Sequence, residues 1–248
     1  MRPTIGITSG FGPDPASKGR LRSYLNAAYT DAISRAGGLP LILPTPAEWD
    51  DALLAGITRA CDGLLFSGGP DLHPRHYGQA LHAKAEPLHE RRDRFDIALF
   101  RHADALPDLP ILAVCLGSQI TNVARGGKLV QHVDDLRGAP AVVHHDEADA
   151  AMHSIRILAD SRLAEVMGVT QCEINSRHHQ AVDAQHIGAG LRAVAFAADG
   201  VVEATEDAAG GGKFLIAVQW HPEDMLDRPE QLRLFAALVE RAGMKVPY

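Results

Sequence analysis

Cys115 is the residue of this chain whose surroundings most strongly indicate chemistry. It follows the apolar run 111–114, which has the branched-residue character of a buried strand, and it precedes Leu116-Gly117-Ser118-Gln119. The pattern after Gly117 indicates the start of a helix, and glycine suits a tight turn between closely packed elements. Parallel α/β folds place their ligands at this strand-to-helix edge, so Cys115 is predicted to be a nucleophile. The competing interpretation is a small buried core residue.

A base for such a nucleophile is found near the C-terminus. An attacking cysteine needs a partner that activates the thiol and protonates the leaving group, and a third group that orients this partner. His221 and Glu223 follow the apolar run 214–219 directly, and Pro222 stiffens the turn between them. A carboxylate two residues after the histidine can fold back to the ring. Cys115, His221 and Glu223 are therefore predicted as a catalytic triad, against the alternative that His221 is a solvated surface histidine.

The segment Ser67-Gly68-Gly69-Pro70 follows another buried-type run. Its glycines allow backbone amides to approach a substrate closely, as an oxyanion site requires. The backbone N–H groups of Gly69 and Leu116 are predicted as the two donors, although Gly-Gly-Pro by itself is more typical of a plain turn.

The remaining cysteines are predicted to be packing residues. Cys61 adjoins a buried run, and Cys172 has no turn-forming residues around it. Three widely spaced cysteines without a C-x-x-C pair fit neither a disulfide framework nor a structural zinc site. The chain is therefore expected in a reducing, cytoplasmic setting.

Two histidine-rich segments raise the question of a metal. They are His178-His179 and His144-His145-Asp146. Adjacent histidines point apart on a strand, and no H-x-x-x-H helical spacing supports a ligand cage. No metal and no cofactor are expected on these grounds.

The order of elements predicts an α/β fold in one domain spanning residues 1–248. The first half alternates apolar runs with helical periods, which indicates a mostly parallel sheet with helices on both faces. The second half has strands joined by short turns, which indicates an antiparallel extension of the same sheet. The long segment 69–92 is expected to border the site. Strands are expected at 4–8, 39–43, 62–66, 110–114, 154–158, 193–197, 201–205 and 214–219, and helices at 21–36, 47–57, 93–106 and 229–242.

Composition excludes several classes of partner. The 248 residues are 46% hydrophobic and carry a formal net charge of −7. An acidic surface argues against nucleic acid and against anionic membranes. Neither a leader-like segment nor an apolar run of about 20 residues is evident, so no membrane association is expected. A homodimer is compatible with the sequence, but no surface stripe fixes the oligomeric state.

The three motifs together, in this order and spacing, resemble the class I glutamine amidotransferase superfamily. That resemblance implies a flavodoxin-like core and a Cys–His–Glu triad. Further motifs resemble the γ-glutamyl-γ-aminobutyrate hydrolase family, and the similarity runs from about residue 4 to about residue 240. These motifs are Ile5–Thr8, Phe66–Pro74 with Tyr77-Gly78, Arg92–Asp96, Asn122–Leu129, Asn175–Gln180 and Val218–Glu223.

The resemblance implies a small-molecule γ-glutamyl amide substrate, which is cleaved through a thioester on Cys115 to glutamate and a free amine. Gln119, one helical turn after the nucleophile, is then a candidate for binding the glutamyl group. Asn175 and His178 are further substrate-binding candidates from the family motif. Arg92, with its neighbours Arg91 and Arg94, is a candidate partner for a substrate carboxylate, although a charge run is usually a solvated face.

Two departures from the family pattern leave the amine open. Leu116 stands where family members often have Arg, and Asp96 stands where they usually have Glu. The leaving group can be γ-aminobutyrate, a polyamine or another amine. Two alternatives to the hydrolase are a glutaminase subunit that feeds ammonia to a partner synthetase, and a catalytically silent binding protein. The intact triad argues against the silent protein, and the family-specific motifs favour a stand-alone hydrolase.

Overall fold

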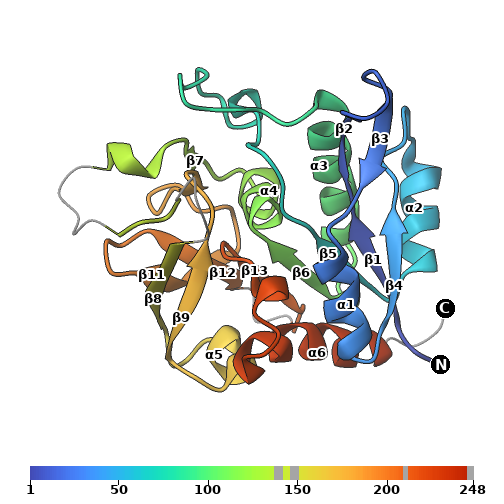
Figure 1. Cartoon of the computed structure of the whole chain (residues 1–248). Helices are drawn as coiled ribbons and strands as arrows, with labels where there is room; N and C mark the ends of the chain where they lie inside the picture. The colour runs from blue at the N-terminus through green and yellow to red at the C-terminus, as the bar shows by residue number, and fades with distance from the viewer. Residues whose placement is uncertain (137–141, 146–150, 209–211, 245–248) are drawn as a thin grey trace.

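The computed structural model describes residues 1–136, 142–145, 151–208 and 212–244 (Figure 1). Within these residues, an 11-stranded sheet runs through both halves of the chain, and a separate two-stranded ribbon lies beside it. The strand order along the main sheet is β4-β1-β5-β6-β13-β12-β11-β8-β9. Off this path, β10 pairs with β12, and β7 pairs with β10.

The first five strands of this order form the parallel half. Every neighbouring pair among them is parallel, from the β1–β4 pair to the β6–β13 pair. Numbered along the chain, these strands stand in the order second, first, third, fourth, fifth, which is the flavodoxin-like arrangement. The expected fold class is therefore confirmed. The five strands are β1 (Thr4–Thr8), β4 (Leu39–Leu43), β5 (Gly63–Phe66), β6 (Ile111–Val114) and β13 (Leu215–Val218).

The remaining strands form the predicted antiparallel extension. β12 pairs antiparallel with β13, and each further neighbour out to β9 is antiparallel as well. These strands are β12 (Val202–Asp207), β11 (Leu191–Ala197), β8 (Ala151–Ile157) and β9 (Gln171–Ser176), with the short strands β7 (Leu129–Val130) and β10 (Ala181–Val182).

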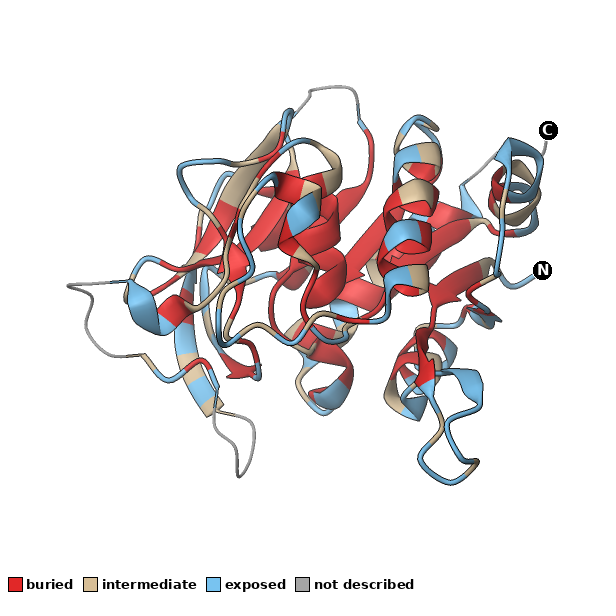
Figure 2. Ribbon diagram, turned by 90° about the horizontal axis from the view of Figure 1, so that it is seen from above, coloured by how far each residue is buried: buried red, intermediate tan, exposed pale blue. Residues whose placement is uncertain are grey.

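Helices cover both faces of the sheet (Figure 1). One buried cluster joins the sheet to α1, α5 and α6, and the other joins it to α2, α3 and α4. Figure 2 shows the strands largely buried between these layers, while the helices expose their outer sides. The helices are α1 (Ala27–Arg35), α2 (Asp51–Ala60), α3 (Glu90–Asp104), α4 (Leu116–Ala124), α5 (Arg162–Met167) and α6 (Pro229–Gly243).

Successive side chains of the central strands point to opposite faces of the sheet, so each strand contributes to both buried clusters. In β6, Leu112 and Val114 belong to the α1/α6 side, and Ile111 and Ala113 belong to the α4 side. Because side chains alternate along a strand, a strand buried on both faces must be apolar at every position. All four residues of β6 are fully buried, which explains why the sequence marked this strand so clearly.

Two of the expected helices have the wrong bounds. The segment predicted as one helix over 21–36 contains β3 (Leu21–Tyr24), which pairs with β2 (Gly10–Pro13) in the separate ribbon, and only then α1. Asn26 ends the extended part, because its side chain caps α1 by accepting a hydrogen bond from the N–H of Ala28. Likewise, the helix predicted over 47–57 begins at Asp51, because Asp50 is its N-cap.

The two cysteines predicted to pack do so. Cys61 is fully buried in the core on the α2 side, and Cys172 packs in part against the opposite core. Burial raises the pKa of the Cys172 thiol to about 11. Among the residues described, no helix is long and apolar enough to cross a bilayer.

Candidate active site

The three predicted motifs follow three neighbouring parallel strands and therefore lie at one edge of the sheet. Ser67 follows β5, Cys115 follows β6, and the segment to His221 follows β13. The registers Phe66↔Ala113 and Val114↔Val218 align the carboxyl ends of these strands. Ligands bind at this edge in open α/β sheets, so the topology itself assembles the site.

Cys115 occupies the elbow between β6 and α4 in a strained backbone conformation. Its φ of 52° and ψ of −107° lie in a region that residues other than glycine rarely adopt. Such strain costs on the order of 1–3 kcal/mol and persists only where the surroundings impose it. Here the Cys115 N–H donates to the carbonyl of Val218 at 2.8 Å, and its own carbonyl accepts from the N–H of Ser118 at 3.0 Å. Cys115 remains buried at the elbow, with 6% of its surface exposed.

Gly117 allows α4 to start this close to β5. A Cβ atom at this position would collide with the carbonyl oxygen of Phe66 and would lie 2.8 Å from the Phe66 Cβ. The prediction that Gly117 serves close packing of neighbouring elements is therefore confirmed.

The ring of His221 lies between Glu223 and Cys115. Its Nδ1 is 2.6 Å from Oε1 of Glu223, and the Cys115 side chain is near enough to the ring to raise its pKa. Because Nδ1 is held by Glu223, Nε2 is left for the sulfur. Burial lowers the pKa of His221, but the charges of Cys115 and Glu223 outweigh it and hold that pKa well above 6.5. The three predicted triad residues are thus brought together, with His221 disposed to carry a proton.

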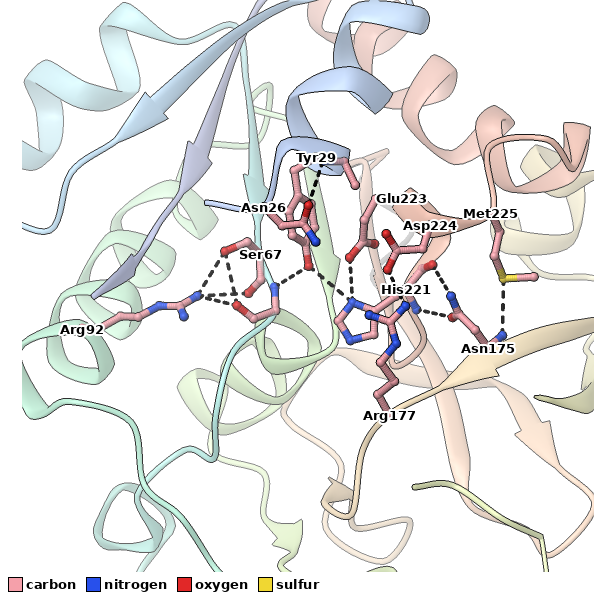
Figure 3. Close-up of polar contacts among 12 residues, drawn as sticks. Asn26, Tyr29, Ser67, Arg92, Asn175, Arg177, His221, Glu223, Asp224 and Met225 are labelled. Carbon is pink, nitrogen blue, oxygen red and sulfur yellow. Dashed lines mark hydrogen bonds and ion pairs between the residues drawn. The ribbon is translucent and has the colours of Figure 1, made fainter. Parts of the chain in front are cut away.

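Asn175 fixes the backbone of His221 from β9 (Figure 3). Its Nδ2 donates to the His221 carbonyl at 2.8 Å, and its Oδ1 accepts from the His221 N–H at 2.9 Å. The sequence predicted Asn175 as a substrate-binding residue, but both polar groups of its side chain are already engaged. Its direct action in this structure is to position His221.

Tyr29 joins α1 to the site, and the sequence analysis did not find it. Its hydroxyl accepts a hydrogen bond from the N–H of Gly68 at 2.9 Å and lies 3.5 Å from Nδ1 of His221. Burial, and next the charge of Glu223, raise the pKa of Tyr29 well above 10. No sequence signal marked this residue, because a tyrosine at an apolar helix position is typical of core packing.

The glycine turn after β5 meets the start of α4. A Cβ at Gly69 would come within 2.9 Å of Leu116 Cδ2, so the side chain of Leu116 lies against the backbone of Gly69. The N–H of Gly68 is occupied by Tyr29, which favours Gly69 as the donor from this turn.

Arg92 holds the same turn from α3 (Figure 3). Its Nη2 donates to the carbonyl of Gly68 at 2.9 Å and to Oγ of Ser67 at 3.1 Å, and its Nε bonds Asp96 at 3.2 Å. Burial raises the pKa of Asp96 to about 6, although Arg92 opposes that shift. With a side chain only 1% exposed, Arg92 supports the turn rather than offering a free cation.

Gln119 and His178 are both buried beside Gln180. Nε2 of Gln119 donates to the Gln180 carbonyl at 3.2 Å and to Oε1 of Gln219 at 3.3 Å. Nδ1 of His178 lies 3.0 Å from the same Gln180 carbonyl, and its Nε2 faces Glu203. In this structure, Gln119 and His178 both contact other protein groups. Their roles in substrate binding stay predictions.

A pocket of ≈ 180 Å³ opens over the glycine turn and His221. Arg92, Arg177 and Glu223 also line it. Arg177 is the exposed cation here, since 41% of its side chain is accessible while it pairs with Asp224 at 2.6 Å. The other two arginines suggested by the sequence contact aromatic rings, because Arg91 lies over Phe11 and Arg94 lies over Trp49.

The fold and the site define a glutamine amidotransferase-like α/β protein. The chain belongs to the Peptidase C26 family, whose model matches residues 3–223, and is thus a hydrolase of that glutamine amidotransferase-like type. It is 36% identical over 251 residues to the Mycobacterium tuberculosis protein named "Putative glutamine amidotransferase Rv2859c", covering 98% of this chain and 75% of that one. It is also 31% identical over 219 residues to the Escherichia coli K12 gamma-glutamyl-gamma-aminobutyrate hydrolase PuuD, covering 83% and 81%.

The fold has solved counterparts at lower identity. A "putative gmp synthase subunit a protein" from Thermoplasma acidophilum superposes with a TM-score of 0.61 at 14% identity, over 97% of this chain and 95% of that one. This likeness extends the shared fold across both the parallel and the antiparallel halves.

Proposed function

We propose that this protein hydrolyses γ-glutamyl amides, with Cys115 as nucleophile and His221 as proton carrier. The carrying observation is the strained cysteine at the elbow with the His221–Glu223 pair, at 2.6 Å, beside it. The 31% identity to a protein named as a γ-glutamyl hydrolase supports the choice of the glutamyl group.

The reaction proceeds in two steps that use the same residues. The sulfur of Cys115 attacks the γ-carbonyl carbon, and the resulting oxyanion is stabilised by backbone N–H groups of Gly69 and Leu116. The C–N bond breaks, His221 gives its proton to the departing amine, and a thioester remains. Water then attacks the thioester as His221 accepts a proton, and glutamate leaves with the thiol restored.

The glutamyl half of the substrate carries an α-carboxylate. The guanidinium of Arg177 lines the pocket and is partly exposed, which supports a role in binding this carboxylate. Its existing partner, Asp224, would then share it with the substrate.

The test is glutamate release from a panel of γ-glutamyl amides. The panel contains γ-glutamyl-γ-aminobutyrate, a γ-glutamyl polyamine and free glutamine, each assayed with the wild type and with Cys115→Ala. We expect release from at least one conjugate and its loss in Cys115→Ala, with Cys172→Ala as a control that keeps activity. Absence of release from every member by folded protein would refute the proposal.

A glutaminase role is the second candidate, and the name of the Mycobacterium relative favours it. The same panel separates the two functions. Preferential release from free glutamine, increased by an added synthetase, would identify an amidotransferase subunit, whereas preference for a conjugate supports the hydrolase.

A pH profile tests the electrostatic role of Glu223. Glu223→Gln keeps the shape of the side chain but removes one of the charges that raise the pKa of His221, so this pKa should fall toward 6.5. His221 must be protonated to protonate the amine, and activity is lost as pH rises through its pKa. The alkaline limb of kcat/KM should therefore move to lower pH. Asp160→Asn, at an exposed carboxylate paired with Arg192, is the matched control. An unmoved limb in Glu223→Gln would contradict the assignment.

A further inference from the structure

A second cluster of ionisable side chains lies in the antiparallel half. It contains His144 from the segment 142–145, His153 from β8, His178 from the turn before β10, and Glu203 from β12. One ligand atom from each residue lies within 4.8 Å of all the others. No side chain of the four is more than 8% exposed, so the cluster is closed to bulk water.

The spacing within the cluster does not fit hydrogen bonds. Oε1 of Glu203 is 3.3 Å from Nδ1 of His144, 3.5 Å from Nε2 of His153 and 3.6 Å from Nε2 of His178. Hydrogen bonds between nitrogen and oxygen are about 2.7–3.2 Å long. Among the described residues, all four of these buried atoms are without a hydrogen-bond partner. A buried polar atom without a hydrogen-bond partner lowers the stability of the fold. Four such atoms that face one another therefore need a common explanation.

The same spacing fits the edges of a metal-ligand tetrahedron. Four nitrogen and oxygen ligands at about 2.0–2.1 Å from a zinc ion lie about 3.3 Å from one another when the arrangement is tetrahedral. The three distances from Glu203 start at this value and exceed it by a few tenths of an ångström. Three imidazoles and one carboxylate are also a donor set that divalent ions of the zinc type accept.

The outer ring nitrogens make the contacts expected of metal ligands. Nε2 of His144 lies 2.8 Å from Oδ2 of Asp199, and Nδ1 of His178 lies 3.0 Å from the Gln180 carbonyl. Because these oxygens only accept, the outer nitrogens carry the protons. A neutral ring then directs its lone pair at Glu203, as metal-bound histidines do with a carboxylate or carbonyl behind them.

The carboxylate of the cluster is enclosed in the interior. Glu203 is 0% exposed, and among the described residues neither of its carboxylate oxygens has a hydrogen-bond partner. Buried charges are paired or coordinate metals.

We propose that His144, His153, His178 and Glu203 form a closed, four-coordinate binding site for a divalent transition-metal ion of the zinc type. Four protein ligands leave no open position for water or substrate, so the site is structural and not catalytic. It crosslinks β8, β12, the segment 142–145 and the turn after β9. The competing arrangement is a metal-free ion cluster in which protons shared with the histidines neutralise Glu203.

The cluster is connected to the active site through β9. Oγ of Ser176 and the N–H of His178 both donate to the carbonyl of His144, at 2.7 and 3.0 Å. Ser176 directly follows Asn175, which holds the backbone of His221. A metal at the cluster would therefore stiffen the strand that positions the proposed proton carrier.

The expectation of no metal rested on neighbouring histidines pointing apart. They do point apart, since His179 turns to Asp71 at 2.9 Å while His178 turns to Glu203. The fold supplies the other two ligands from β8 and β12, which no spacing within one segment reveals. Asp146 lies outside the described residues.

The test is metal content of untagged protein incubated with Zn²⁺ and freed of excess ion. We expect about one tightly held ion per chain by elemental analysis, tetrahedral d–d bands after Co²⁺ exchange, and a Tm that falls with a chelator and recovers with Zn²⁺. His153→Ala should lose the ion and the chelator-sensitive part of the Tm. His145→Ala, an exposed neighbour of the cluster, should lose neither.

A second variant keeps the test decisive if His153→Ala does not fold. Asp199→Asn leaves all four ligands in place and should weaken Zn²⁺ affinity by about 10-fold through the His144 contact. Less than one tenth of an ion per chain in folded wild type after Zn²⁺ incubation, with a Tm indifferent to chelator, would overturn the proposal in favour of the proton-shared cluster. None of these readouts depends on the hydrolase activity.

Discussion

Replacing His221 with Asn is expected to lower kcat for γ-glutamyl amide hydrolysis by about 10⁴–10⁶-fold, the range that loss of one triad member gives in other hydrolases. The substitution removes the ring that lies between Glu223 and Cys115 and supplies the proton for the amine. It leaves the backbone of residue 221, and hence its two hydrogen bonds with Asn175, in place. The measurement is single-turnover and steady-state glutamate release from the conjugate that the panel identifies.

Labelling of the thiols gives an independent readout of the same substitution. In the wild type we expect iodoacetamide to modify Cys115 faster than Cys172 near neutral pH, and His221→Asn should remove this preference because the charged ring no longer faces the sulfur. His186→Asn, at a half-exposed surface histidine, is the matched control. A His221→Asn variant that keeps kcat within tenfold of wild type, or that is labelled as fast at Cys115, would contradict the triad.

The site residues that the sequence predicted are those whose role depends on residues next to them in the chain. Cys115 adjoins a strand buried on both faces, and such a strand must be apolar at every position, so its end could be located. His221 and Glu223 lie two residues apart, so their pairing could be inferred from one turn. The parallel order of β5, β6 and β13 then placed both segments at one edge.

The parts that the sequence did not predict depend on contacts between distant segments. Tyr29 reaches Gly68 across 39 residues, and Asn175 reaches His221 across 46. Tyr29 looks like an ordinary core position of a helix. Asn175 was marked by the family motif as a substrate-binding candidate, but nothing in its own segment indicates the contact with His221. Their functions arise only from packing, which no local pattern contains.

The error at 21–36 has a local cause. Leu21 and Tyr24 fit a helical period, but both are exposed in the β2–β3 ribbon. Periodicity reports which residues are apolar, and it misleads where apolar residues are not buried. Asn26 indicates the start of the helix more reliably than the apolar period does, because asparagine stabilises a helix start and not a helix interior.

Gly117 links this architecture to the nucleophile, and Gly117→Ala is expected to lower the free energy of unfolding by about 2–3 kcal/mol. The added Cβ would meet the backbone carbonyl of Phe66, and a backbone oxygen cannot rotate aside as a flexible side chain can. The matched control is Gly56→Ala in the middle of α2, where a Cβ meets nothing within 4 Å. That control should gain about 0.5–1 kcal/mol, the ordinary preference of a helix for alanine.

Urea unfolding of the two variants beside the wild type measures both effects, with the midpoints compared at an unchanged slope. The opposite signs make the comparison informative, since the same chemical change is made in two helices and only its surroundings differ. Equal gains in both variants would show that α4 can move away from β5 without cost. Such freedom would also contradict the account of the Cys115 elbow, because a strained φ of 52° persists only while strand and helix are held at this separation.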